Sequence, residues 1–461
     1  MKKTIFLLSL LGLYFISAIA FSQGMREKDR SRYYDIGKKF YCETHILPYK
    51  TDSVKILILF KIGYDQLSFQ KINSADISRG EFAADADFEF EFRDADGIIC
   101  HRDVWEDTIF VSNYDMIKSD TNFVIGGIIS ILKSGPYDLH FRMAGPNMQN
   151  SQKKTLPKIE DVNFFTNYTI SKPIFVNYYD FEKFQKAKPF ILENGISFRS
   201  SGASLIIPVS YKSEYEKYSY KIKYLGQKKT VVYWEKTDDL YGKIIPQPNA
   251  FVDLILPNQK NNPLLSINNI ILPKDTAIKF KIGLLKLDIP QEKIAPGIYE
   301  LTLSRDGSKD TLKEQFEVVW EDMPLSLYNP DYAADMMYYI LTDDECDALK
   351  KGSQKEIMQK IINYWQKHDP TPNTPYNEAM AEYFRRIDYA FFNFQTVNQN
   401  DGAKTDRGKI YILNGPPDSR DTNLGTDKTT ETWKYIKLKK IYIFETAKTD
   451  NLILVKVNDI K

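Results

Sequence analysis

The chain has 461 residues, which is enough for about three domains. Its 62 Lys and Arg residues nearly balance its 61 Asp and Glu residues, and the net charge is +1. This balance excludes a bulk electrostatic field for nucleic acid or for an anionic membrane surface. The 30 Tyr and 28 Phe residues favour strands and interaction surfaces over a helical bundle.

The N-terminus has the three parts of a secretory signal. Lys2 and Lys3 precede an apolar run over residues 5–16, and small residues follow near a cleavage point. We predict a signal peptide over residues 1–22, cleaved before Gln23, with cleavage before Phe21 or an uncleaved anchor as alternatives.

The expected product is exported to the periplasm or the cell surface. No cysteine stands at the start of the mature chain, so a lipid-anchored form is not expected. No later stretch is long and apolar enough to predict a second membrane segment.

The cysteine pattern leaves two interpretations open. Cys42, Cys100 and Cys346 are an odd number of thiols without CxxC spacing. In an oxidising compartment Cys42 and Cys100 can form a disulfide. Alternatively, the thiols are buried as small hydrophobic side chains.

Residues 23–145 are predicted to form a first β-sandwich domain. Residues 84–93 alternate apolar and charged side chains, which predicts a strand with one buried face, and 54–60 is a second strand. The turn signal at Asp94 to Gly97 predicts a hairpin. The aspartates of this turn also suggest a calcium site, but its distal Glu is missing, so turn chemistry is the better interpretation.

Residues 146–158 are polar and are predicted to form a linker, followed by a second β-sandwich domain over 159–322. Its strands include 203–209 and 229–235. A short echo between residues 135–141 and 297–303 suggests two similar modules, although convergent strand patterning explains it as well. Short strands separated by turns predict immunoglobulin-like sandwiches.

The spacing of the apolar residues changes from strand-like to helical after Trp320, and residues 325–461 are predicted to form an α+β domain. Pro330 begins a helix, and capping boxes start at Thr342 and Ser353. A further helix is predicted from Thr374-Pro375, and three strands follow near the C-terminus. These predicted strands cover residues 432–436, 440–444 and 452–457.

Residues 401–418 have the most distinctive local pattern in the chain, and we predict a polar loop, a strand over 410–413 and a tight turn. Gly408 and Gly415 lie where a loop needs positive φ or a close backbone approach, and Pro416-Pro417 ends the strand. The sequence therefore predicts an ordered site.

Several separated motifs lie in the C-terminal part of the chain, at residues 364–370, 377–380, 383–390, 402–418 and 431–435. In this order they resemble the GWxTD-domain family of exported bacterial proteins, which is common in Bacteroidota. The resemblance covers residue 325 to the C-terminus closely, and the β-rich region before it also fits the family layout. It implies the architecture and export but no reaction, because the family's activity is unassigned.

This chain departs from the motif that names the family. Gly402, Thr405 and Asp406 match it, whereas Ala403 stands where the family has Trp. If that Trp contacts a ligand or partner, the resemblance implies an altered function here.

The candidate site has an enzymatic and a structural interpretation. In the first, Asp406, Asp418 and Glu431 converge as the acid and base of a hydrolase. In the second, Asp406 accepts hydrogen bonds from its own loop, and Arg407 pairs with Asp418 or Glu431. The candidate residues are Gly402, Thr405, Asp406, Arg407, Gly408, Gly415, Asp418 and Glu431.

The structural interpretation agrees better with the rest of the sequence. The chain has no HExxH, GxSxG or glycine-rich phosphate loop, so no metal or cofactor is predicted. We therefore expect a non-catalytic envelope protein that docks a protein or glycan through residues 402–418. The alternative is a carboxylate-dependent hydrolase of peptide or polysaccharide.

Overall fold

The computed structural model describes most of the chain. The described residues are 40–72, 79–118, 122–144, 152–156, 158–180, 186–198, 202–227, 237–248, 251–256, 264–266, 280–396, 398–425, 428–446 and 451–460. The predicted signal peptide and the predicted strand 229–235 lie outside them.

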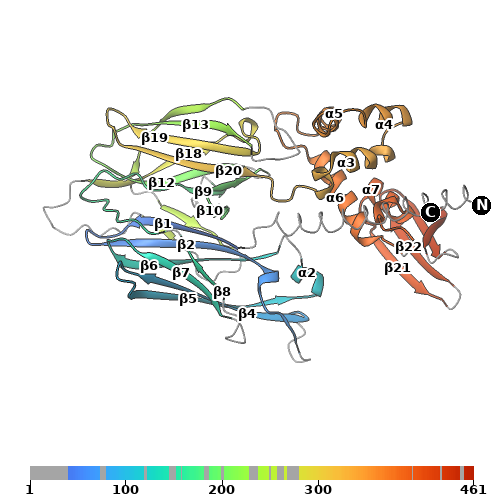
Figure 1. The fold of residues 1–461 in the computed structure, drawn as a ribbon, viewed down its shortest axis with the longest axis horizontal. Coiled ribbons are helices and arrows are strands. Elements are labelled where there is room, and N and C mark those ends of the chain that lie inside the picture. Colours follow the sequence, from blue (N-terminus) through green and yellow to red (C-terminus); the bar gives the residue numbers. More distant parts are fainter. Residues whose placement is uncertain are drawn as a thin grey trace, which may run out of the picture.

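The protein is β-rich, and its longer helices belong to the C-terminal part (Figure 1). Two sheets form a first pair. One contains β1 (Phe40–Pro48), β2 (Ser53–Gly63) and β6 (Phe123–Lys133), and the other contains β3 (Gln70–Lys71), β4 (Phe82–Arg93), β5 (Ile99–Val111), β7 (Asp138–Ala144) and β8 (Gln152–Thr155). The short helix α2 (Tyr114–Lys118) follows β5.

Two larger sheets form a second pair. In spatial order, the first contains β15 (Gln247–Pro248), β18 (Lys281–Ile289), β12 (Ala203–Tyr211), β9 (Ile174–Asp180), β10 (Lys186–Pro189), β16 (Phe251–Leu254) and β17 (Leu264–Ser266). The second contains β11 (Gly195–Ser197), β20 (Thr311–Val319), β19 (Gly297–Arg305), β13 (Tyr218–Gly226) and β14 (Leu240–Ile244).

The alternating strand near residue 90 is confirmed as β4. Phe88, Phe90 and Phe92 are fully buried, as the period of two predicts. β4 pairs antiparallel with β5 through the predicted turn, where the Asp94 carboxylate accepts hydrogen bonds from the N–H groups of Asp96 (3.0 Å) and Ile98 (2.9 Å).

The linker prediction for 146–158 is wrong over the part that the structure describes. β8 pairs antiparallel with β7, and Leu156 and Ile159 are buried in the core of the first sheet pair. Because an edge strand is hydrogen-bonded on one side only, it tolerates the polar sequence that resembles a linker.

β2 is buried on both faces, which stacks the two sheet pairs on one another. Ile56, Ile58 and Phe60 belong to the core of the first pair. Leu57 and Leu59 point the other way and share a second core with Ile174, Val176 and Leu284 of the second pair. The four sheets therefore form one layered stack (Figure 1).

A buried carboxylate also joins the two sheet pairs. Glu43 of β1 accepts hydrogen bonds from the N–H groups of Leu192 (2.8 Å) and Asn194 (3.2 Å), in the loop between β10 and β11. Ile191 and Asn194 of this loop have positive φ values of 49° and 63°. Glu193, between them, also has a positive φ of 53°, and the loop in this conformation directs the N–H groups of Leu192 and Asn194 toward the Glu43 carboxylate.

None of the three cysteines takes part in a disulfide. Cys42 and Cys346 are buried, whereas Cys100 is exposed on β5. The disulfide considered for Cys42 and Cys100 is therefore not formed, and two of the three thiols are buried as small hydrophobic side chains.

The C-terminal part has helices first and a sheet after them. The helices are α3 (Pro330–Met336), α4 (Asp343–Leu349), α5 (Gln354–Gln366), α6 (Glu378–Asn393) and α7 (Asp406–Asn414), and the sheet has the order β21 (Ser419–Leu424), β22 (Thr429–Tyr435), β23 (Lys440–Thr446), β24 (Leu452–Asp459). The three predicted final strands correspond to β22, β23 and β24, whereas the polar strand β21 was not predicted.

The predicted helix starts are confirmed with one exception. Thr342 and Ser353 each form a capping box, and Pro330 begins α3. The prediction of a start at Thr374-Pro375 is wrong, because Asn377 caps α6 through a 2.8 Å bond from the Met380 N–H. Of the described helices, none is long and apolar enough to cross a membrane.

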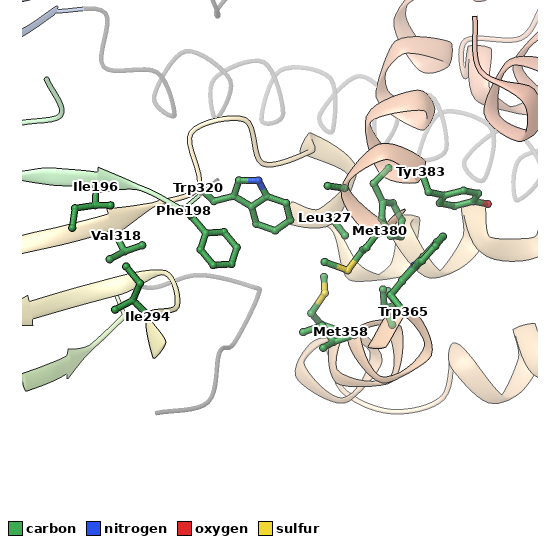
Figure 2. Packing of buried hydrophobic residues seen from close by; sticks show 14 of the residues in the cluster. Ile196, Phe198, Ile294, Val318, Trp320, Leu327, Met358, Trp365, Met380 and Tyr383 are labelled. Atoms are coloured by element: carbon green, nitrogen blue, oxygen red, sulfur yellow. The ribbon is translucent and has the colours of Figure 1, made fainter. Parts of the chain in front are cut away.

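An aromatic joint connects the second sheet pair to the C-terminal helices (Figure 2). The Trp320 ring lies 5.9 Å from that of Phe198 and 5.8 Å from that of Tyr376. One continuous core runs from Val318 through this joint to Trp365 of α5. The C-terminal part is thus packed onto the end of the stack.

Candidate functional site

Residues 410–413 are helical, so the predicted strand is wrong. They belong to α7, which begins after the N-cap Thr405 and ends before the C-cap Gly415, whose φ is 78°. The Thr405 hydroxyl accepts a 3.0 Å hydrogen bond from the Gly408 N–H. A short apolar run does not distinguish a strand from a buried helix, but the Thr cap and the terminal Gly are helix signals that the strand interpretation overlooked.

Gly402 and Gly408 allow the backbone around α7 to approach its neighbours closely. A Cβ on Gly402 would lie 2.2 Å from the Ala390 carbonyl oxygen of α6. A Cβ on Gly408 would lie 2.1 Å from the Gly402 carbonyl oxygen. These separations are too short for any side chain, so both glycines are required by packing.

Ala403, at the position of the family Trp, is fully buried. Its carbonyl oxygen accepts a 2.8 Å hydrogen bond from the Tyr339 hydroxyl. The preceding Asp401 accepts one of 3.1 Å from the Tyr332 hydroxyl, and burial raises the pKa of the Asp401 carboxyl. In this chain the side chain at this position therefore points into the protein.

Asp406 connects α7 to the edge of the C-terminal sheet. Its carboxylate accepts a 2.8 Å hydrogen bond from the Leu454 N–H of β24. The bond lies beside a register shift in the pairing of β23 with β24. The predicted bond within its own loop is replaced by one to a strand that lies far away in the sequence.

Arg407 and Glu431 form a buried ion pair, as one of the predicted pairings has it. The Arg407 Nη1 lies 3.1 Å from the Glu431 carboxylate, which is 1% exposed. Arg420 of β21 pairs with the same carboxylate, and the Trp433 Nε1 donates a 2.5 Å hydrogen bond to it. Burial lowers the pKa of the Arg407 guanidinium, and the Glu431 charge opposes this shift.

Aromatic rings surround this ion pair. The Arg407 and Arg420 guanidiniums lie 5.3 Å and 5.9 Å from the centre of the Phe394 ring. The Phe394 ring in turn lies 5.2 Å from the Trp433 ring. Sequence reasoning missed Arg420 because β21 was not predicted.

The three candidate carboxylates have different hydrogen-bond or ion-pair partners. The Asp418 carboxylate accepts a 2.6 Å hydrogen bond from the Ile436 N–H. Ile436 follows Glu431 by five residues, so the two backbone positions are roughly 16 Å apart at about 3.3 Å per residue. Glu431 of β22 is in register with Phe444 of β23, which is in register with Leu454 of β24. Asp406 is therefore bonded to a backbone N–H two strands away from Glu431, at a strand spacing of about 10 Å.

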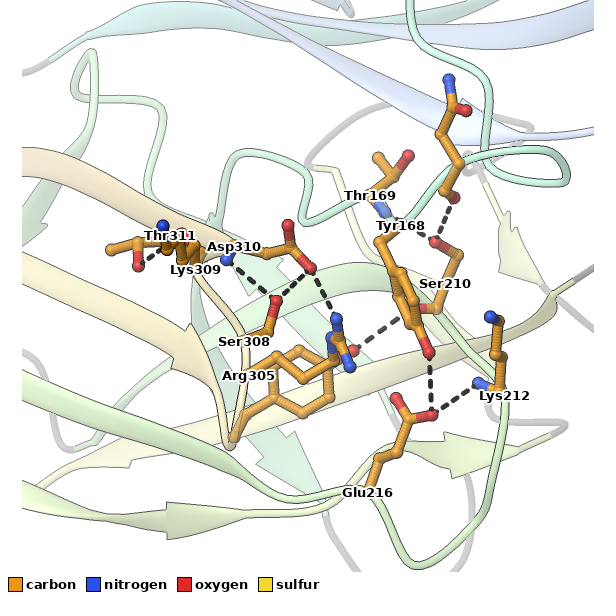
Figure 3. Close-up of polar contacts among 12 residues, drawn as sticks. Tyr168, Thr169, Ser210, Lys212, Glu216, Arg305, Ser308, Lys309, Asp310 and Thr311 are labelled. Carbon is orange, nitrogen blue, oxygen red and sulfur yellow. Dashed lines mark hydrogen bonds and ion pairs between the residues drawn. The ribbon is translucent and has the colours of Figure 1, made fainter.

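A second polar cluster, which the sequence did not predict, lies in the second sheet pair (Figure 3). The Arg305 guanidinium lies 3.6 Å from the centre of the Tyr168 ring and 2.7 Å from the Asp310 carboxylate. Hydrogen bonds from Ser308 and Arg305 hold the pKa of Asp310 below its usual range. The Tyr168 hydroxyl donates to Glu216 (3.3 Å), so these contacts fasten loops to one another.

The described residues contain no group of three or more His, Cys, Asp or Glu side chains that could hold a metal ion. The chain thus combines a β-rich body with a C-terminal α+β part whose motif residues organise the packing of a helix on a sheet. Residues 298–454 match the family model of the GWxTD domain, so this part of the chain is a GWxTD domain. Comparison with curated proteins gives no match.

The matched region begins inside the second sheet pair. It includes β19 and β20 as well as the helices and the final sheet. The aromatic joint around Trp320 gives a physical reason, because these strands and the helices share one hydrophobic core.

Proposed function

We propose that this chain is an exported, non-catalytic binding or assembly protein of the cell envelope, which docks a protein or glycan through its C-terminal domain. In this proposal the two sheet pairs are immunoglobulin-like sandwich modules that carry the domain. The proposal extends the family assignment, which gives no activity.

Exposed apolar side chains on the C-terminal sheet carry the proposal. They come from β21, the turn between β22 and β23, and β24, and they are Leu424, Ile436, Leu438, Ile453, Val455 and Val457. Each is at least 43% exposed. Single exposed apolar residues are ordinary, but a concentration on one small sheet is typical of an interaction surface.

This surface replaces residues 402–418 as the proposed docking element. In the structure the Gly402, Gly408 and Arg407 positions are buried. Asp406 and Asp418 accept hydrogen bonds from Leu454 and Ile436. The motif therefore supports the sheet that is proposed to bind.

Site-specific photo-crosslinking in the native envelope tests this function. A crosslinking residue at Ile436 or Val455 of the full chain is expected to give one discrete protein or glycan adduct. Matched controls are Tyr215 and Tyr241, which are 90% and 79% exposed on the second sheet pair. Adducts from the control positions alone, or from no position, would overturn the proposal.

The export part has its own test. The N-terminus of the protein isolated from envelope fractions is expected at Gln23 or Phe21. An intact Met1 on a cytoplasmic protein would contradict export.

A further inference from the structure

β21 is an exposed edge strand with one hydrogen-bonded neighbour among the described strands. All six of its residues, Ser419–Leu424, are exposed. It begins the sheet order β21-β22-β23-β24, so its outer row of backbone N–H and C=O groups has no strand partner in the described part of the chain. Such an edge can pair with a further extended segment.

An excess of positive charge lies beside this edge. The ion pairs of Arg407 and Arg420 both run to the single carboxylate of Glu431. Two guanidiniums on one carboxylate leave one positive charge in excess on this face of the strand, whereas Asp421 lies on the opposite face. The buried Arg407 Nε has no hydrogen-bond partner among the described residues, and the Arg420 side chain is 43% exposed.

The opposite edge of the same sheet is built differently. At β24 the Leu454 N–H is already bonded to the Asp406 carboxylate, and the pairing with β23 has a register shift. Bulges and covering contacts of this kind protect an edge from further pairing. The described contacts of β21 show neither device, which distinguishes it as the open edge of the sheet.

We propose that β21 binds an extended acidic segment of a partner protein by strand addition, and that Arg420 pairs with a carboxylate of that segment. This inference rests on the proposed binding function and specifies its site and the chemistry of the partner. Backbone hydrogen bonds would hold the segment, and side chains would select it.

The strand period defines the pattern that the partner needs. Arg420 and Leu424 are four residues apart and therefore lie on the same face of β21. Leu424 is 79% exposed. A paired segment places side chains directly opposite both residues, so an acidic residue opposite Arg420 and an apolar residue four positions away opposite Leu424 would complement this face.

Selection from a library of random displayed peptides on the full-length protein tests the inference. The wild type is expected to enrich strand-forming peptides with an acidic and an apolar residue four positions apart. Arg420→Ala is expected to weaken the selected peptides about tenfold or more, since a charge-assisted pair is lost. Asp421→Ala, on the opposite face of the strand, is the matched control and is expected to retain their binding.

Two proline variants test the backbone contribution. Successive residues direct their N–H groups to opposite sides of a strand, so one of Thr422→Pro and Asn423→Pro removes an outward N–H and the other removes a bond to β22. The variant that loses the outward N–H is expected to fold and to lose peptide binding. Circular dichroism shows which of the two variants is folded.

The outcomes separate this inference from the proposed function. The β21 site is overturned if the selected peptides are basic or lack an acidic and an apolar residue four positions apart. It is also overturned if binding survives both Arg420→Ala and the folded proline variant. If the envelope adduct at Val455 forms equally in these variants, the binding function stands without β21. If neither a peptide nor an adduct is obtained, both proposals fail.

Discussion

The Asp406 carboxylate holds the Leu454 N–H at 2.8 Å, which joins the first turn of α7 to the edge strand β24. A residue of the motif that names the family therefore stabilises the contact between a helix and a sheet. The acid also lies in the first turn of α7, where a negative charge interacts favourably with the helix dipole.

Loss of this contact is expected to loosen β24 locally. Asp406→Ala removes the acceptor, and one hydrogen bond is worth about 1 kcal/mol. We expect about fivefold faster native-state hydrogen exchange at the Leu454 amide. Asp406→Asn keeps an acceptor oxygen and is expected to restore most of the protection. Equal exchange in all three proteins would show that the bond does not stabilise the edge.

Breaking the ion pair between Arg407 and Glu431 is expected to lower the free energy of unfolding much more than loss of the Asp406 bond. Glu431→Ala leaves the Arg407 guanidinium buried without its counter-charge, and such a loss costs about 3–5 kcal/mol. Urea unfolding followed by tryptophan fluorescence measures the free energy of unfolding.

A nearby surface pair provides the control. Glu445 pairs with Lys428 at 2.7 Å, where the Lys side chain is 55% exposed, so Glu445→Ala is expected to cost less than about 1 kcal/mol. Adding Arg407→Met to Glu431→Ala is expected to recover part of the lost stability. Equal costs for Glu431→Ala and Glu445→Ala would contradict the buried pair.

Gly402 and Gly408 are predicted not to tolerate a larger side chain. Gly402→Ala and Gly408→Ala introduce a Cβ within 2.2 Å and 2.1 Å of a carbonyl oxygen. We expect each to lower the free energy of unfolding by about 1–3 kcal/mol or more. Gly202→Ala is the control, because nothing lies within 4 Å of its added Cβ. Thermal denaturation compares the three, and a neutral Gly402→Ala would refute the close approach.

Asp388 predicts a pH dependence of stability. Its carboxylate accepts hydrogen bonds from the N–H groups of Leu325 (2.6 Å) and Ser326 (2.9 Å), and burial raises its pKa from 3.8 to about 6. Between these values the folded state binds more protons than the unfolded state, so stability falls as the pH rises. The stabilisation that protonated Asp388 contributes is complete below the unfolded pKa of 3.8 and is lost as the pH rises through about 6.

The Asp388→Asn variant isolates this effect. The difference in the free energy of unfolding between wild type and variant is expected to change with pH between about 4 and 6, and to be constant above about 7. Urea titrations at several pH values measure it. A difference that is independent of pH would show that Asp388 titrates at its ordinary value.

The sequence by itself determined the elements whose signals are local. The alternation of Phe88, Phe90 and Phe92 specified a strand, and the capping boxes at Thr342 and Ser353 specified helix starts, because these patterns reflect bonds and faces within a few residues. The motifs from residue 364 onward also identified the family that the model of residues 298–454 matches.

Only the tertiary structure decided what the motif residues contact. The run 410–413 is helical because Thr405 caps it and the sheet packs against it, and period alone does not separate these outcomes. Arg420 reached Glu431 through the pairing of β21 with β22, and β2 joined the two sheet pairs because both of its faces are apolar. These contacts connect residues far apart in sequence, and no local pattern encodes which distant segment will cover a given face.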